Sequence, residues 1–203
     1  MDNANFGQNL HAFGFVSGLG DKLLCERIIP RWTLAAKGAS MGVVPRIMSL
    51  PYEEIVDGET LLRSPPGPRH EKICVRLHAR VAEGLASNTV ARLLAPRSVV
   101  QLSAGTMVRP DLALVTVATG KLWLAVEIIN SEDHRPDTVL KKAIYEQYNV
   151  ARLWMVDPRY DNVEMYHGTT YGLALRGILA AKERVVEPLL PGLDLAVGEL
   201  FRV

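Results

Sequence analysis

Cysteine is scarce in this sequence, and its two copies, Cys25 and Cys74, lie far apart. No Cys-x-x-Cys pair and no nearby pair of histidines accompanies them, which argues against a zinc site and against a disulfide framework. Long apolar runs are also lacking, since the longest fall well short of the roughly 18 residues that a membrane-spanning helix needs. The N-terminal residues do not form the basic flank of a signal peptide. We therefore expect a cytoplasmic protein without a membrane segment.

Net charge is nearly absent too. The 203 residues carry a formal charge of +1, so no overall field draws the protein onto nucleic acid. Any contact with DNA needs a local basic cluster, although such a row of charges is more often a solvated helix face. The candidates are Arg63, Arg69, Lys72, Arg76 and Arg80.

The composition is that of an ordinary globular chain, with 48% apolar and 22% charged residues. Residues 1–48 differ from the rest because they mix Gly, Asn and Ser with scattered apolar residues and show no period. We interpret them as an N-terminal extension without an assigned fold, dispensable for the folding of residues 49–203. The second segment is expected to form one domain.

Apolar spacing predicts the order of elements in residues 49–203. Asp57-Gly58 between two strand-like runs predicts a tight hairpin over 55–62, and apolar residues at helical spacing predict a helix over 69–85. The remaining predicted elements are strands at 90–94 and 99–102, apolar strands around Asp111 and Glu127, a helix over 136–148, and strands at 153–157, 163–167 and 171–175. This order indicates an α+β fold, in which a mixed β-sheet flanked by helices follows an N-terminal β-hairpin and meander.

Two carboxylates occur in the apolar strands. Glu127 lies inside the run 122–129, where an unpaired charge would cost several kcal/mol, and Asp111 directly precedes the run 112–117. Because a short loop joins the two strands, the carboxylates are expected to lie together as a site for Mg²⁺ or Mn²⁺. In the metal-free protein the two like charges are expected to repel, so amide replacements are predicted to leave stability unchanged or raise it.

The predicted helix over 136–148 supplies a cation. Asp137, Lys141 and Tyr145 are spaced at i, i+4 and i+8 and share one helix face. A lysine on that face can stabilise developing negative charge. Lys142 points about 100° away and is the weaker candidate. Asp137 and Lys141 can also be read as an ordinary exposed ion pair.

Pro110-Asp111 followed by Glu127 resembles the PD-(D/E)xK nuclease superfamily. The usual lysine place, two residues after the glutamate, holds Ile129, and the resemblance implies that Lys141 replaces it. More closely, residues 53–203 resemble the Uma family of putative restriction endonucleases. Two departures are Glu53, where the family has tyrosine, and Asn130-Ser131-Glu132, where it has Ser-Pro-Ser. The matching motifs are Glu54 to Glu59, Pro68-Arg69-His70, Pro110-Asp111, Val126-Glu127-Ile128, Asp137 to Tyr145, Trp154 to Pro158 and Pro191-Gly192-Leu193.

The resemblance implies a restriction-endonuclease-like fold and a metal-dependent DNA endonuclease that hydrolyses phosphodiester bonds with a metal-activated water. Asp111 and Glu127 would hold the metal, and Lys141 would be the catalytic lysine. The alternative is a catalytically inactive nuclease fold that binds nucleic acid or a protein. Cleavage of two strands favours a homodimer.

Five further residues are possible accessories to this site. Glu54 or Glu59 would reach the metal from the first hairpin, unless both are solvated hairpin charges. His70 would contact a phosphate or hold a water, unless it is a structural cap. Asp137 and Tyr145 complete the set through the helix face that they share with Lys141.

Overall fold

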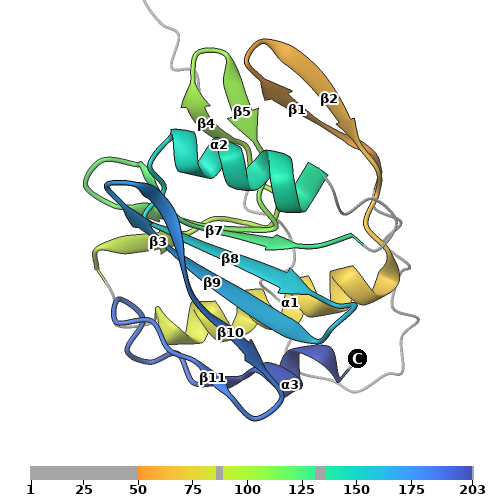
Figure 1. Ribbon diagram of the computed structural model, residues 1–203, viewed down its shortest axis with the longest axis vertical. Helices are drawn as coiled ribbons and strands as arrows, with labels where there is room; N and C mark the ends of the chain where they lie inside the picture. The colour runs from red at the N-terminus through yellow and green to blue at the C-terminus, as the bar shows by residue number, and fades with distance from the viewer. Residues whose placement is uncertain (1–49, 86–88, 131–135, 203) are drawn as a thin grey trace, which may run out of the picture. The chain divides into compact units, whose positions relative to one another are not determined.

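The computed structural model describes residues 50–85, 89–130 and 136–202, and Figure 1 shows how their elements are arranged. The extension predicted for residues 1–48 lies outside these residues, so its boundary stays a prediction. Within the described part of the chain, no helix combines the length and the apolar character needed to cross a membrane.

The larger of the main sheets has six strands in the order β10-β9-β8-β7-β6-β3. Only β7 and β8 are parallel among these neighbours, so the sheet is mixed as predicted. The strands are β3 (Ala91–Leu93), β6 (Leu112–Thr116), β7 (Leu122–Ile128), β8 (Arg152–Asp157), β9 (Asn162–Thr169) and β10 (Gly172–Ala180).

Helices cover both faces of this sheet (Figure 1). Helices α1 (Pro68–Gly84) and α3 (Val197–Phe201) pack on one face, while the π-helical turn η1 (Pro136–Lys141) and α2 (Lys142–Gln147) lie over the other. Successive strand residues alternate between the faces. Val126 and Ile128 belong to the α1 core, so Glu127 between them is directed to the α2 face.

A second sheet has four strands in the order β2-β1-β5-β4. Its strands are β1 (Tyr52–Val56), β2 (Glu59–Arg63), β4 (Val100–Ser103) and β5 (Thr106–Val108). The predicted hairpin turn is confirmed, since Asp57 and Gly58 have φ of 51° and 85°, both positive as a type I′ turn requires.

The predicted α+β fold class is confirmed, but the strands before Asp111 are divided between two sheets. Strand β3 pairs with β6 in the large sheet, whereas β5, which the sequence did not predict, pairs with β1 and β4. Near the C-terminus, β11 (Arg184–Val185) and β12 (Leu195–Ala196) form a further short pair that apolar spacing also missed. Such short strands carry too few residues for a period to be read.

Candidate active site

Asp111 and Glu127 lie opposite each other where β6 begins and β7 ends. Leu112 pairs with Val126, so continuing the antiparallel register by one residue sets Asp111 beside Glu127. The Ile128 N–H donates to Asp111 Oδ2 over 2.9 Å, which ties the loop before β6 to β7. The two carboxylates are only 4% and 2% exposed, and both line one pocket of about 240 Å³. The structure therefore brings the two predicted metal ligands together.

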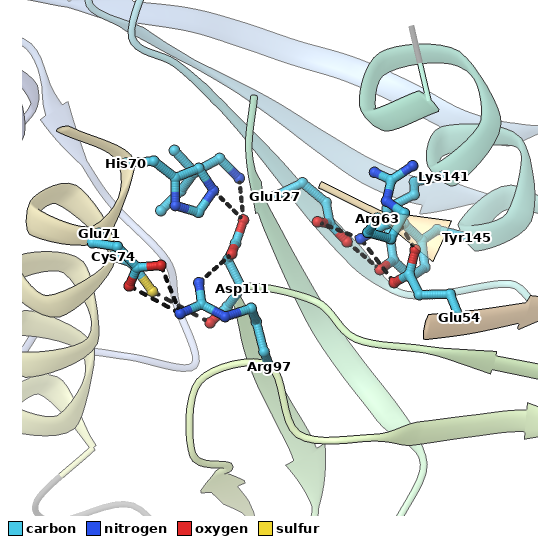
Figure 2. A network of polar contacts seen from close by, with 11 residues as sticks. Glu54, Arg63, His70, Glu71, Cys74, Arg97, Asp111, Glu127, Lys141 and Tyr145 are labelled. Atoms are coloured by element: carbon cyan, nitrogen blue, oxygen red, sulfur yellow. Dashed lines mark hydrogen bonds and ion pairs between the residues drawn. The ribbon is translucent and has the colours of Figure 1, made fainter. Parts of the chain in front are cut away.

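Asp111 is surrounded by donors from two other segments (Figure 2). His70 Nε2 of α1 lies 3.0 Å from Asp111 Oδ2, and Arg97 Nη1 lies 3.3 Å from Oδ1. Arg97 is in turn fixed by Glu71, with 2.8 Å between Nη2 and Oε1. Burial by itself raises the pKa of Asp111, but the charge and hydrogen bond of His70, the charge of Lys141 and the Ile128 N–H outweigh it, so the pKa lies below 3.8.

Glu127 contacts a lysine at the end of η1 and a tyrosine in α2. Lys141 Nζ lies 2.9 Å from Glu127 Oε2, and the Tyr145 hydroxyl donates to Oε1. Lys141 is 1% exposed, and its ammonium also contacts Glu54 Oε1 at 3.0 Å. Burial, followed by the Glu127 carboxylate, raises the pKa of Tyr145 well above 10, so this phenol stays protonated and can keep donating.

The helix geometry explains which lysine reaches Glu127. Lys141 and Tyr145 are four residues apart across the start of α2, so both face the sheet. Lys142 is turned elsewhere, with its Nζ 4.3 Å from the centre of the Tyr166 ring. Lys141 ends the π-helical turn η1, a kind of irregularity that is frequent at functional sites.

Glu54 lies next to Lys141 within this network. Its carboxylate is 3% exposed, accepts the Arg109 N–H over 2.7 Å, and lies 3.4 Å from Arg63 Nε. The first hairpin therefore supplies a buried acid. The interpretation of Glu54 as a solvated hairpin charge is wrong.

The other four accessory candidates differ in whether the structure places them at the two carboxylates. Glu59 is exposed at the start of β2 and is not one of the described residues that line the pocket. Asp137 belongs to η1, but its side chain lies outside the described part of the structure. His70 and Tyr145 both contact the carboxylates.

Sequence reasoning missed Tyr52 and Arg97 of this site, and it considered Arg63 only as a member of a basic cluster. Tyr52 and Arg63 line the pocket from the first hairpin, and Arg97 reaches Asp111 from the loop before β4. Burial raises the pKa of Tyr52 to about 12; the charge of Lys141 opposes this shift, and Asp111, Glu127 and Glu54 add to it. Only the nearness of Tyr52 and Arg63 to the hairpin predicted over 55–62, which Glu54 also flanks, could have indicated them, and Arg97 carries no local signal.

The donor set suits a hard divalent cation. Within the described residues, no cluster of three or more His, Cys, Asp or Glu side chains forms a metal cage. Mg²⁺ does not require one, since it commonly uses one or two carboxylates and takes its other ligands from water and substrate. Among the described residues, Asp111 Oδ1 has the long 3.3 Å contact to Arg97, which leaves this oxygen able to bind a cation. The pair of carboxylates therefore fits the predicted ion.

Two of the five residues of the predicted basic cluster, Arg76 and Arg80, have partners on or next to α3. Arg76 donates to the carbonyl oxygens of Glu199 and Arg202 at the end of α3, and Arg80 pairs with Glu83 and Glu199. The bonds to Glu199 and Arg202 hold α1 and α3 together, whereas the Arg80–Glu83 pair lies within α1, so Arg76 and Arg80 are both engaged by structural partners.

The chain was compared with known proteins. A family model, Uma2, described as a putative restriction endonuclease, matches residues 49–198. The chain belongs to this family.

A similar solved structure is that of a putative nuclease belonging to DUF820 from Anabaena variabilis ATCC 29413. The two share a TM-score of 0.62 and 14% identity over 74% of this chain and 90% of that chain. At this identity the likeness shows the fold alone. No curated protein matches the chain. Membership of the Uma2 family confirms the resemblance found in the sequence motifs.

The pair of His70 and Asp111 leads to a prediction on folding stability. Burial by itself lowers the pKa of His70, but the Asp111 charge and hydrogen bond raise it above 6.5. The stability contributed by His70 is therefore present below about pH 6.5 and is lost as the pH rises through the folded-state pKa. The contribution of Asp111, whose pKa is lowered from 3.8, is present above that value and is lost as the pH falls.

We expect the free energy of unfolding of the metal-free protein to exceed that of His70→Gln most between about pH 4 and 6.5. Urea unfolding of both proteins in EDTA across this range measures the difference. A difference that increases steadily above about pH 7 would contradict the assignment of the pair.

Proposed function

We propose that the protein is an endonuclease that hydrolyses phosphodiester bonds of DNA with the help of Mg²⁺ or Mn²⁺. The observation that supports it most is the placement of Asp111 and Glu127 in one pocket, with the buried Lys141 hydrogen-bonded to Glu127. Membership of a family of putative restriction endonucleases supports the same class of reaction.

Asp111 and Glu127 are the proposed metal ligands. When bound there, the ion supplies Lewis-acid polarisation of the phosphoryl oxygen and lowers the pKa of the attacking water. The surrounding residues orient the two carboxylates: His70 and the Ile128 N–H fix Asp111, while Tyr145 and Lys141 fix Glu127. Such outer contacts hold a ligand in one rotamer and keep it ionised.

Lys141 has a separate role in this proposal. Its ammonium lies between Glu54 and Glu127, so the two carboxylates set the position of the charge. A cation held in place before the reaction stabilises the negative charge that develops on the phosphoryl group without having to reorganise. Glu54 is then a positioning residue for Lys141.

The proposal is tested with supercoiled plasmid, because a closed circle has no ends and its cleavage reports an endonuclease. We expect nicked and then linear DNA in Mg²⁺ or Mn²⁺ and intact plasmid in EDTA. Linear duplex, single-stranded DNA and RNA of equal length define the substrate class in the same assay. Binding of DNA without cleavage in either metal would contradict the proposal and favour an inactive nuclease fold that acts as a binding module.

The homodimer and the cytoplasmic location stay predictions. A dimer would set two sites against the two strands of a duplex, and sedimentation of the protein with and without DNA measures whether it forms.

A further inference from the structure

A second hollow adjoins the pocket of the two carboxylates. It has a volume of about 330 Å³ and shares two lining residues, His70 and Asn130, with the first pocket. Its walls come from the start of α1 and from the residues that follow β7 and β8. The charged side chains in its lining are two arginines, Arg69 and Arg159.

Backbone N–H groups at the start of α1 border this hollow. The helix has 17 residues, and its N-cap, Gly67, provides no side chain to cap it. The first amides of a helix have no acceptor within it. Pro68 has no N–H, and the Glu71 N–H is bonded to Gly67 O. The amides of Arg69 and His70 are therefore directed out of the helix, at the end where its dipole attracts anions.

The His70 side chain provides an independent observation. It is 8% exposed, its Nε2 contacts Asp111, and its Nδ1 has no hydrogen-bond partner among the described residues. A buried polar atom without a partner costs free energy. The ring lines both hollows, and Nδ1 is the ring nitrogen that Asp111 does not engage, able to act as donor or acceptor according to its protonation.

The two arginines are held at the hollow by neighbouring groups. Arg69 donates to Pro158 O and to Asp161 Oδ1, both at 2.6 Å. Arg159 Nη2 donates to Asp157 Oδ2, also at 2.6 Å. Both arginines line the hollow, whereas their partners Asp157 and Asp161 are not among its described lining residues.

We propose that this hollow is a subsite for a phosphate group of the substrate backbone, next to the phosphate that is cleaved. The Arg69 and His70 amides, with the two guanidinium groups, would bind its oxygens. The shared wall at His70 and Asn130 places the subsite beside the carboxylates, so one strand can pass through both hollows. That the phosphate belongs to DNA rests on the proposed function, whereas the anion site itself does not.

Gly67→Asp tests the subsite. Gly67 has φ of −74°, and a Cβ added there meets nothing within 4 Å, so the substitution fits the fold. An aspartate at an N-cap accepts hydrogen bonds from the second and third helical amides, which here are those of Arg69 and His70. The variant therefore fills the proposed site with its own carboxylate. Ala196→Asp, at the N-cap of α3, adds the same group where the first two helical amides already donate to Glu183 O and Ala181 O, and it is the matched control.

The first measurement uses inorganic phosphate with metal-free protein and follows the amide resonances of Arg69 and His70 by NMR. We expect saturable shifts in the wild type and in Ala196→Asp, and none in Gly67→Asp. Absence of these shifts in the wild type would overturn the subsite, whatever the protein does to DNA.

The second measurement is the affinity for a short DNA duplex in EDTA, where no cleavage occurs. We expect Gly67→Asp to bind at least about tenfold more weakly than the wild type, because two charge-assisted hydrogen bonds are lost and a like charge is added. Ala196→Asp should bind as the wild type does.

The phosphate and DNA measurements together distinguish failure of the proposed subsite from failure of the proposed function. Phosphate shifts in a wild type that cleaves plasmid, together with unaltered DNA affinity of Gly67→Asp, would overturn the subsite for the strand and leave the nuclease intact. Phosphate shifts in a protein that neither binds nor cleaves DNA would overturn both the assignment of the phosphate to DNA and the proposed function.

Discussion

Asp111→Asn is expected to abolish metal-dependent cleavage. An amide keeps the shape of the side chain but removes the anionic oxygen that the cation needs. The Lewis-acid contribution of a bound metal is several kcal/mol, so we expect the rate to fall by about three orders of magnitude or more. Plasmid cleavage in Mg²⁺ and Mn²⁺ measures this loss, and calorimetric titration of the metal should show that binding is weakened with it.

The same substitution is also expected to destabilise the metal-free protein. The sequence suggested the opposite, on the premise that two uncompensated carboxylates repel. The structure contradicts that premise, because Asp111 is paired with His70 and Arg97, and Glu127 with Lys141 and Tyr145. Asparagine has one acceptor oxygen for three donors, and leaving buried donors unsatisfied costs about 1–3 kcal/mol.

Asp194→Asn is the matched control, since Asp194 is 77% exposed and pairs with Arg184 on the surface. Its unfolding free energy should change by less than about 0.5 kcal/mol. Both variants are compared by urea unfolding in EDTA. An Asp111→Asn protein as stable as the wild type would favour the premise that the two carboxylates repel each other. An Asp111→Asn protein that still cleaves DNA would refute the assignment of Asp111 as a metal ligand.

Lys141→Met is expected to lower the cleavage rate by about two to three orders of magnitude, because one preorganised stabiliser of developing charge is lost. Lys142→Met is the matched control, since Lys142 packs over Tyr166 and should affect the rate little. Single-turnover cleavage at saturating metal measures the chemical step for both. A fast Lys141→Met and an inactive Lys142→Met would reverse the assignment.

The Lys141→Met variant is also expected to lose folding stability, because it removes a buried cation. The ammonium contacts two buried carboxylates, Glu54 and Glu127, and a methionine would remove this shared cation while leaving Arg63 beside Glu54 and the Tyr145 hydroxyl on Glu127. Breaking a buried pair in this way typically costs about 3–5 kcal/mol. The double variant Glu54→Gln with Lys141→Met removes one of the two charges and should recover part of that stability. If this double variant is folded and cleaves as fast as the wild type, Lys141 has no role in the reaction.

Several features of the site depend on local sequence, and these could be predicted. Asp57-Gly58 adopts the positive φ angles that a tight hairpin needs, so β1 and β2 were expected correctly. The short loop after β6 forces an antiparallel pair with β7, which sets Asp111 beside Glu127. Because of the helical period, the side chains of Lys141 and Tyr145 both reach Glu127, whereas that of Lys142 lies over Tyr166. Each of these relations links residues that are close in the chain.

Only the tertiary structure decided what surrounds the two carboxylates. The pairing of β3 with β6 and of β5 with β1 brings Arg97 to Asp111 and Glu54 to Lys141. Glu54 and Lys141 are distant in the sequence, and for neither pair does a period or turn motif record which strand edges meet. Their positions follow from burying both faces of the large sheet at once, under α1 on one side and α2 on the other. The sequence alone thus indicated the two acids and the lysine as candidates, while the packing of the sheet determined the buried ion pairs around them.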